Sequence, residues 1–291
     1  MREFYLVDKS WESVYNKYEV FDMIYVGGVA MNRVDMRGLN VLALGDSLFS
    51  GTPNSDPPCV DKDQWVNLLG ISCGWNLSNL GIGGMTVSLT ANNVVSGNQS
   101  MYDWLYHGLY DYRWGSREEH PKGNMFFHCG EISGKPEDVE LILLEGGNKD
   151  YGYKIAAPLG EVDSEDPATF LGAWNLVTAR LLEQYPNALI LFITPWELNG
   201  SQARPDGMAS IPYTRGLLRL YEARYAGNSR VALIDAGKPE ISGVDMNDPA
   251  WKQEYSFDNY HLKPSGMKVI AERMLPLIEL AVADYRARRN G

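Results

Sequence analysis

Only three cysteines occur among the 291 residues, and neither a long apolar stretch nor a Gly–Pro repeat is present. Cys59, Cys73 and Cys129 are odd in number and widely spaced, so they indicate no disulfide framework and no cysteine-based zinc site. No apolar run reaches the roughly 18 residues that a transmembrane helix needs. The 29 glycines and 15 prolines follow no period, which excludes a collagen-like chain. What remains is a globular composition, with 45% hydrophobic and 11% aromatic residues.

The sequence is also short of positive charge. It has 26 Lys and Arg against 37 Asp and Glu, a net charge of -11. A polyanion would be repelled, so we expect no nucleic-acid partner, and a neutral or cationic substrate fits better. The N-terminus lacks the basic and then apolar build of a signal peptide. We therefore expect a cytoplasmic protein without a membrane partner, although a secreted protein trimmed of its leader would look the same.

The chain divides near residue 38. Residues 1–38 mix aromatic and charged residues with a Gly27-Gly28 pair and show no clear hydrophobic period. This pattern predicts a small N-terminal extension, with a β-hairpin around residues 21–36, packed on a main domain that spans residues 39–291.

From residue 39 on, short apolar runs alternate with helical patterns. The predicted strands are Leu39–Leu44, Trp75–Leu80, Val139–Leu144, Ala188–Thr194 and Val231–Asp235. The predicted helices are Gln64–Cys73, Pro167–Tyr185, Ser210–Ala226 and a last helix that begins at Pro264. Strands that alternate with helices pair in parallel, and continuously apolar strands are covered on both faces. The fold class is therefore predicted to be α/β, a three-layer α/β/α sandwich with about five parallel strands.

Two details of the helices are predicted as well. Asp166 is expected to cap the second helix, with Pro167 in its first turn. Pro276 is expected to kink or restart the last helix, because proline cannot donate the helical hydrogen bond.

Polar and glycine-rich segments stand at the strand ends, where parallel α/β folds carry their sites. They are Gly45-Asp-Ser-Leu48, Asn79-Leu-Gly-Ile-Gly-Gly-Met-Thr86, Glu145-Gly-Gly-Asn-Lys-Asp150 and, before the last helix, Asp258-Asn-Tyr-His-Leu-Lys-Pro-Ser-Gly266. Each alone is typical of an ordinary turn or helix cap. Together, and in this order, they resemble the SGNH, or GDSL, hydrolases, a family of esterases and lipases, over residues 39–288.

The resemblance implies an SGNH (flavodoxin-like) hydrolase fold and a serine nucleophile at Ser47. A serine hydroxyl needs a base to take its proton, and among the four histidines only His261 has a carboxylate, Asp258, three residues earlier. We therefore predict a catalytic triad of Ser47, Asp258 and His261. The family chemistry implies no metal and no organic cofactor.

The same resemblance implies three oxyanion donors: the backbone N–H groups of Ser47 and Gly84, and an asparagine side chain. The third block departs from the usual GxND pattern. One register supplies Asn148 but puts Lys149 where aspartate is usual, and the other keeps Asp150 but puts lysine at the asparagine position. We predict Asn148 as the donor, because a neutral amide can point an N–H at the oxyanion. Lys149 remains the alternative.

Other polar and aromatic residues have two interpretations each. Asp46 and Asp150 are expected to hold turns. The aromatic segment 101–114 either builds a satellite core or lines a substrate surface, and Trp196 either walls an acyl pocket or packs in the core. Three aspartates after the nucleophile either select a polar substrate or are solvated: Asp56, Asp61 and Asp63. A further group matches no metal-ligand spacing: His107, His120, His128 and Cys129.

Together these features predict a serine esterase that hydrolyses short-chain esters, acetyl foremost and carried on carbohydrates, through an acyl-enzyme intermediate. Its partner would be a small-molecule or oligosaccharide ester. A lipase- or thioesterase-type acylhydrolase is the alternative within the class. A non-catalytic binding module on the same fold is the alternative outside it.

Overall fold

The computed structural model describes residues 23–26, 29–32, 34–50, 63–89, 100–103, 105–106, 135–152, 156–196, 211–257 and 261–290, and for the first two ranges only the backbone. The N-terminal pair of strands, β1 (Met23–Val26) and β2 (Val29–Asn32), is antiparallel. These strands fall within the range predicted for a hairpin. The division of the chain into an extension and a main domain stays a prediction.

The centre of the molecule is a sheet of five parallel strands. In chain order they are β3 (Asn40–Leu44), β4 (Asn76–Asn79), β5 (Leu141–Glu145), β6 (Leu189–Ile193) and β7 (Val231–Ile234). Their order across the sheet is β4-β3-β5-β6-β7, which is the flavodoxin-like order. Every residue of β5 and β6 is buried, as expected for strands covered on both faces. The predicted α/β fold class is confirmed.

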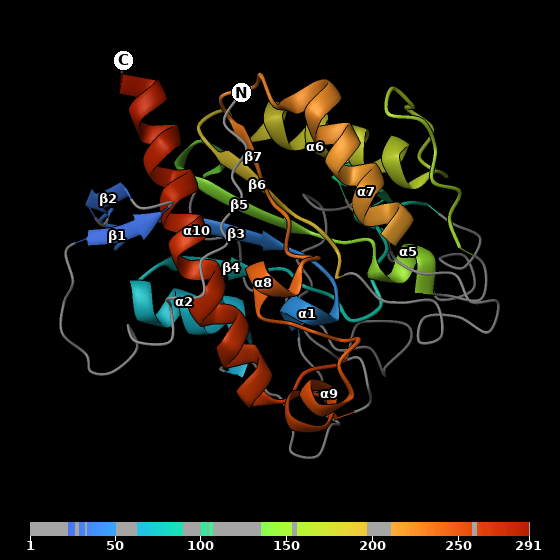
Figure 1. Ribbon diagram of the computed structural model, residues 1–291. Coiled ribbons are helices and arrows are strands. Elements are labelled where there is room, and N and C mark those ends of the chain that lie inside the picture. Colours follow the sequence, from blue (N-terminus) through green and yellow to red (C-terminus); the bar gives the residue numbers. More distant parts are fainter. Residues whose placement is uncertain are drawn as a thin grey trace, which may run out of the picture.

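Helices cover both faces of this sheet (Figure 1). The described helices are α1 (Ser47–Ser50), α2 (Trp65–Cys73), α4 (Met101–Asp103), α5 (Asn148–Gly152), α6 (Phe170–Gln184), α7 (Ile211–Leu220), α8 (Pro239–Ser242), α9 (Pro249–Tyr255) and α10 (Pro264–Asn290). A 3-10 turn (Pro136–Asp138) precedes β5, and a π-helical turn (Tyr221–Tyr225) extends α7. Helices α2 and α10 pack together on one face, and α6 and α7 pack together on the other.

The structure bears on two predicted helix details. Helix α6 begins at Phe170 and its N-cap is Thr169, whose side chain accepts a hydrogen bond from the Gly172 N–H. Asp166 instead accepts from the Ala168 N–H, in the turn before the helix, so the predicted cap was three residues too early. Pro276 lies inside α10, a continuous helix of 27 residues, so the helix does not restart there, and the kink stays a prediction.

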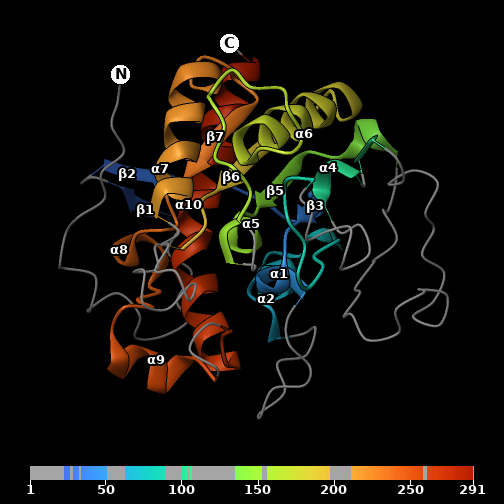
Figure 2. The same cartoon turned by 90° about the vertical axis from the view of Figure 1, so that its right-hand side faces the viewer.

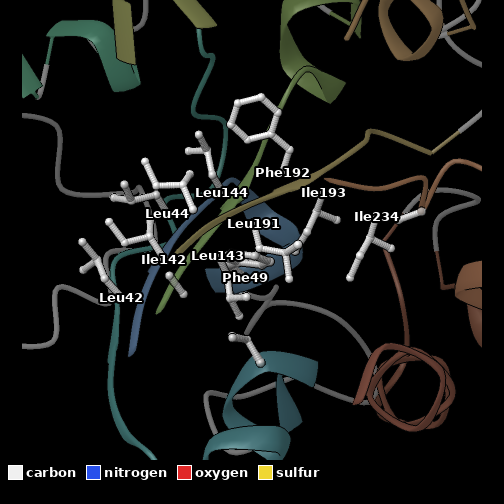
Figure 3. Packing of buried hydrophobic residues seen from close by; sticks show 14 of the residues in the cluster. Leu42, Leu44, Phe49, Ile142, Leu143, Leu144, Leu191, Phe192, Ile193 and Ile234 are labelled. Atoms are coloured by element: carbon white, nitrogen blue, oxygen red, sulfur yellow. The ribbon is translucent and has the colours of Figure 1, made fainter. Parts of the chain in front are cut away.

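The hydrophobic core fills the space between the sheet and its helices. Leucine, isoleucine and phenylalanine side chains project from β3, β5, β6 and β7 to both sides of the sheet (Figure 3). Trp196, which follows the end of β6 by three residues, is buried in this core. Of its two predicted roles, the structure therefore supports packing. Among the described residues, no helix combines the length and apolarity that crossing a bilayer requires.

Candidate active site

Two short helices bring the predicted site residues to one end of the sheet. Helix α1 follows β3 and helix α5 follows β5, and β3 and β5 are neighbouring parallel strands. Their carboxyl ends therefore lie side by side, and Figure 2 shows α1 and α5 next to each other at this end. The sheet order thus brings the first and third sequence blocks together.

The turn after β3 presents Ser47. The backbone carbonyl of Asp46 accepts hydrogen bonds from the N–H groups of Phe49 and Ser50, both at 3.1 Å. The Asp46 carboxylate accepts from the Leu48 N–H at 2.9 Å. Asp46 is fully buried, so its carboxylate acts within the turn, in agreement with the structural role expected for it. Ser47 is the first residue of α1, and its side chain is largely buried.

His261 lies against the serine. The distance from His261 Nε2 to Ser47 Oγ is 3.2 Å, although 214 residues separate the two in the sequence. The imidazole stacks on the ring of Phe257, with 5.8 Å between ring centroids and 13° between planes. This contact places a base within reach of the hydroxyl proton, as nucleophilic catalysis by serine requires.

Backbone pairing holds the loop that carries His261. The Phe257 N–H donates to the His261 carbonyl at 3.2 Å, and the Lys263 N–H donates to the Tyr255 carbonyl at 2.8 Å. The Lys263 ammonium also donates to the Gln253 carbonyl at 2.7 Å. These bonds fix the imidazole between α9 and α10. Asp258, the predicted acid of the triad, lies outside the described residues.

The glycine block after β4 adjoins the serine turn. The Asn79 amide donates to the Phe49 carbonyl at 2.8 Å, and the Ile82 N–H donates to the Gly45 carbonyl at 2.9 Å. Gly84 follows with φ of 85°, a left-handed conformation that favours glycine. Gly84 is half-buried, and its role as a backbone oxyanion donor remains a prediction.

Asn148, the predicted third donor, is directed inward. Its side chain is only 1% exposed, and Nδ2 donates to Glu145 Oε1 at 2.7 Å. Lys149, the next residue, is half-buried. Asn148 therefore has a partner within the fold, and the choice between Asn148 and Lys149 as oxyanion donor stays a prediction.

Three buried carboxyl groups lie at the carboxyl ends of β3 and β5: Asp46, Glu145 and Asp150. Burial raises the pKa of Glu145 well above its usual range, and the neighbouring charge of Asp46 raises it further. Burial also raises the pKa of Asp46, which the charge of Lys149 and the Leu48 N–H oppose. Sequence reasoning missed Glu145. Its only signal was an acidic residue at the end of an otherwise apolar strand.

Asp150 ties α5 to the residues after the glycine block. Its carboxylate accepts hydrogen bonds from the N–H groups of Val87 and Ser88, both at 2.9 Å, and from the Ser88 hydroxyl. Burial nevertheless raises the pKa of Asp150 to about 6. These bonds agree with the turn-holding role expected for Asp150.

Part of the aromatic segment belongs to the core. Met101 and Leu105 are buried, and the rings of Tyr102 and Tyr106 stack with centroids 4.7 Å apart. The Tyr106 hydroxyl donates to the Leu176 carbonyl of α6 at 3.2 Å. The described part of this segment thus packs on α6. Several residues singled out from the sequence lie outside the described ranges: Asp56, Asp61, His107, His120, His128 and Cys129.

Known proteins resemble this chain in fold and not in sequence. No protein-family model matches the sequence, and no curated protein matches it. A solved protein from Lactobacillus plantarum is similar, with a TM-score of 0.58 and 21% identity, over 84% of this chain and 98% of that one. A family two carbohydrate esterase from Clostridium thermocellum, solved with cellohexaose, has a TM-score of 0.53 and 12% identity, over 88% of this chain and 68% of that one.

A third similar structure is a carbohydrate esterase family 2 enzyme with a carbohydrate binding domain, from Corynascus thermopiles. Its TM-score is 0.56 at 12% identity, and the match covers 89% of this chain and 71% of that chain. At such identities the likeness establishes a shared fold. The α/β fold predicted from the sequence is therefore one that carbohydrate esterases also use.

Proposed function

We propose that the protein is a serine esterase that hydrolyses short-chain esters, acetyl foremost, through an acyl-enzyme intermediate. The observation that carries the proposal is the 3.2 Å contact between Ser47 Oγ and His261 Nε2 at the carboxyl end of the sheet. A hydroxyl in contact with an imidazole is the minimal pair for acyl transfer, because the base removes the proton as the oxygen attacks.

In this mechanism Ser47 Oγ attacks the ester carbonyl and His261 takes the hydroxyl proton. The backbone N–H groups of Ser47 and Gly84 stabilise the oxyanion, with a side chain from the third block as a further donor. His261 then gives its proton to the leaving alcohol, and the acyl group remains on Ser47. Finally His261 activates a water molecule that releases the acid. Asp258 orients the imidazole throughout.

The substrate class in this proposal is an O-acetylated carbohydrate. Two observations support it: family two carbohydrate esterases share the fold, and an aromatic-rich segment follows the glycine block in the sequence. Aromatic rings provide flat apolar surfaces that suit the faces of sugars. No metal or organic cofactor takes part in the proposed steps.

The test is turnover of p-nitrophenyl acetate and of acetylated oligosaccharides by the wild-type protein and by Ser47→Ala. Ser50→Ala is a matched control, because Ser50 is a buried serine of the same short helix whose hydroxyl has no partner among the described residues. Ser47→Ala should lower kcat by at least about 10³ and Ser50→Ala should not. Equal rates for wild type and Ser47→Ala would indicate a binding module instead of an esterase.

A further inference from the structure

A carboxyl group from the neighbouring strand reaches beneath the nucleophile turn. Glu145, the last residue of β5, is only 2% exposed. Its Oε2 accepts a hydrogen bond from the Asp46 N–H at 3.3 Å, and its Oε1 accepts from Asn148 Nδ2 at 2.7 Å. One side chain thus joins the backbone just before Ser47 to the start of α5.

The residue before Asp46 leaves room for this approach. A Cβ placed on Gly45 would lie 3.1 Å from Glu145 Oε2 and 2.6 Å from the Phe49 ring. Contacts this short would push the carboxyl away from the turn. The glycine of the first sequence block therefore serves the packing of Glu145 as well as that of Phe49.

The neighbouring charges determine whether the Glu145 carboxyl makes these contacts in its ionised or its protonated form. The charged groups that act on it are Asp46 after β3 and Lys149 and Asp150 on α5. Burial opposes the charge of both carboxyls, and each is favoured by a backbone N–H donor and by the charge of Lys149. Asp46 is favoured further by the charge of His261 and by a hydrogen bond from the Asn148 side chain, whereas Glu145 faces the charges of Asp46 and Asp150. Since two adjacent buried carboxylates repel each other, the pair favours sharing one proton, and the stronger upward shift of the Glu145 pKa favours placing it on Glu145.

We propose that Glu145, in its neutral form, is a positioning residue that fixes the turn carrying Ser47 by bridging the Asp46 backbone to the Asn148 side chain. This inference rests on the proposed function, since it concerns the same nucleophile. A neutral carboxyl needs an acceptor for its own O–H. Asn148 Oδ1, which is buried and accepts no hydrogen bond from the described residues, provides one when the amide turns over, and that turn replaces the contacts of Nδ2 with Glu145 and Asp46.

The experiment measures how fast a fluorophosphonate probe labels Ser47, which reports the nucleophile without assuming an ester. Glu145→Gln keeps the shape and the neutral charge, so it should label within about threefold of wild type, whereas Glu145→Ala should label about 100-fold more slowly. Glu279→Ala is a matched control, since it removes a buried carboxyl midway along α10. That control should label like wild type.

The pH dependence of labelling separates positioning from general stability. In the alkaline range wild type should lose labelling as Glu145 ionises beside Asp46, whereas Glu145→Gln should keep it. Lys149 and Asp150 are the same in both proteins, so the difference isolates Glu145. If Glu145→Ala does not fold, the comparison of wild type with Glu145→Gln tests the proposal by itself. Identical labelling profiles of these two proteins in the alkaline range would overturn the proposal.

Three further outcomes are distinguishable. Glu145→Ala that folds and labels like wild type would overturn the positioning role while leaving the esterase intact. Wild-type protein that labels at Ser47 but hydrolyses no ester would overturn the proposed function, and the labelling rates would still decide the role of Glu145. Protein that does not label at Ser47 at all would overturn both.

Discussion

At the scale of single residues, the site depends on a hydroxyl, an imidazole and a set of buried carboxyls. Ser47 and His261 lie at hydrogen-bond distance. The carboxyl groups of Asp46 and Glu145 hold the turn that carries Ser47 by accepting hydrogen bonds from its backbone N–H groups. The polar groups around the serine turn are shielded from water, so the hydrogen bonds that hold them are made within the protein. Single substitutions here therefore test individual bonds.

His261→Ala should lower kcat by at least about 10³ with little change in the melting temperature, because removal of the base leaves the hydroxyl unactivated. The measurements are steady-state kinetics with p-nitrophenyl acetate and thermal unfolding. Near-normal turnover by His261→Ala would contradict the mechanism.

Asn148→Ala and Lys149→Ala should differ in their effects on turnover. Asn148→Ala should lower kcat by about 10²–10³ with little change in KM, because an oxyanion donor acts mainly in the transition state. Lys149→Ala should be mild if lysine only adjusts the local charge. Both variants should first be shown to melt like wild type. A kcat loss confined to Lys149→Ala would assign the oxyanion contact to lysine.

Asp150 should make the stability depend on pH. Its pKa is raised from 3.8 to about 6 by burial, so the folded state favours the protonated carboxyl. The contribution of this protonated carboxyl to the free energy of unfolding is fully present below the unfolded-state pKa of 3.8. It is lost as pH rises through the folded-state pKa of about 6, and the total loss is about 3 kcal/mol. Urea unfolding of wild type and Asp150→Asn across this range measures the difference. If the free energy of unfolding depends on pH in the same way in both proteins, Asp150 is not the source of the pH dependence.

At the scale of elements, local hydrogen bonds decide where helices begin. Both Asp166 and Thr169 carry side chains that can cap a helix, but the chain uses Thr169 for α6 and keeps Asp166 for the preceding turn. Propensity alone does not separate them, because both residue types are good N-caps.

Thr169→Ala should destabilise the protein by about 1 kcal/mol, since the Gly172 N–H at the start of α6 loses its side-chain acceptor. Asp166→Ala is the matched control and should cost less, because Asp166 is exposed and lies before the helix. Urea unfolding of the two variants gives the comparison. A larger loss of unfolding free energy for Asp166→Ala than for Thr169→Ala would favour Asp166 as the cap, as predicted from the sequence.

At the scale of the whole molecule, the order of strands assembles the site from distant blocks. β3 lies between β4 and β5, so the turn with Ser47 is flanked by the glycine block on one side and by Glu145 and Asn148 on the other. Helix α10 begins just after His261 and packs beside α2. The sheet and this helix together bring the imidazole to the serine.

The chain as a whole also lacks a long apolar segment that would cover a fatty acyl chain. Activity should therefore fall along a series of p-nitrophenyl esters from acetyl to octanoyl. The measurement is kcat/KM for each ester, with Ser47→Ala as the background. A maximum at octanoyl or longer would overturn the short-acyl assignment and favour a lipase.

The sequence by itself determined the parallel α/β architecture, because apolar runs and helical periods report burial that is local to each segment. It also singled out Ser47 and His261, because their blocks resemble those of SGNH hydrolases and because only His261 has a carboxylate three residues earlier. The architecture follows from patterns within short segments, and the site residues follow from short blocks taken in their order along the chain. The observed contact between the two side chains agrees with them.

Only the tertiary structure decided which groups meet across the sheet. Glu145 reaches the Asp46 backbone from a strand 99 residues later, and Asn148 turns to Glu145. For Trp196 the sequence left two roles open, and only the strands and helices that surround it place it in the core. Such contacts depend on strand order and on burial of one element against another. No spacing within a single segment encodes them, so the sequence could not predict them.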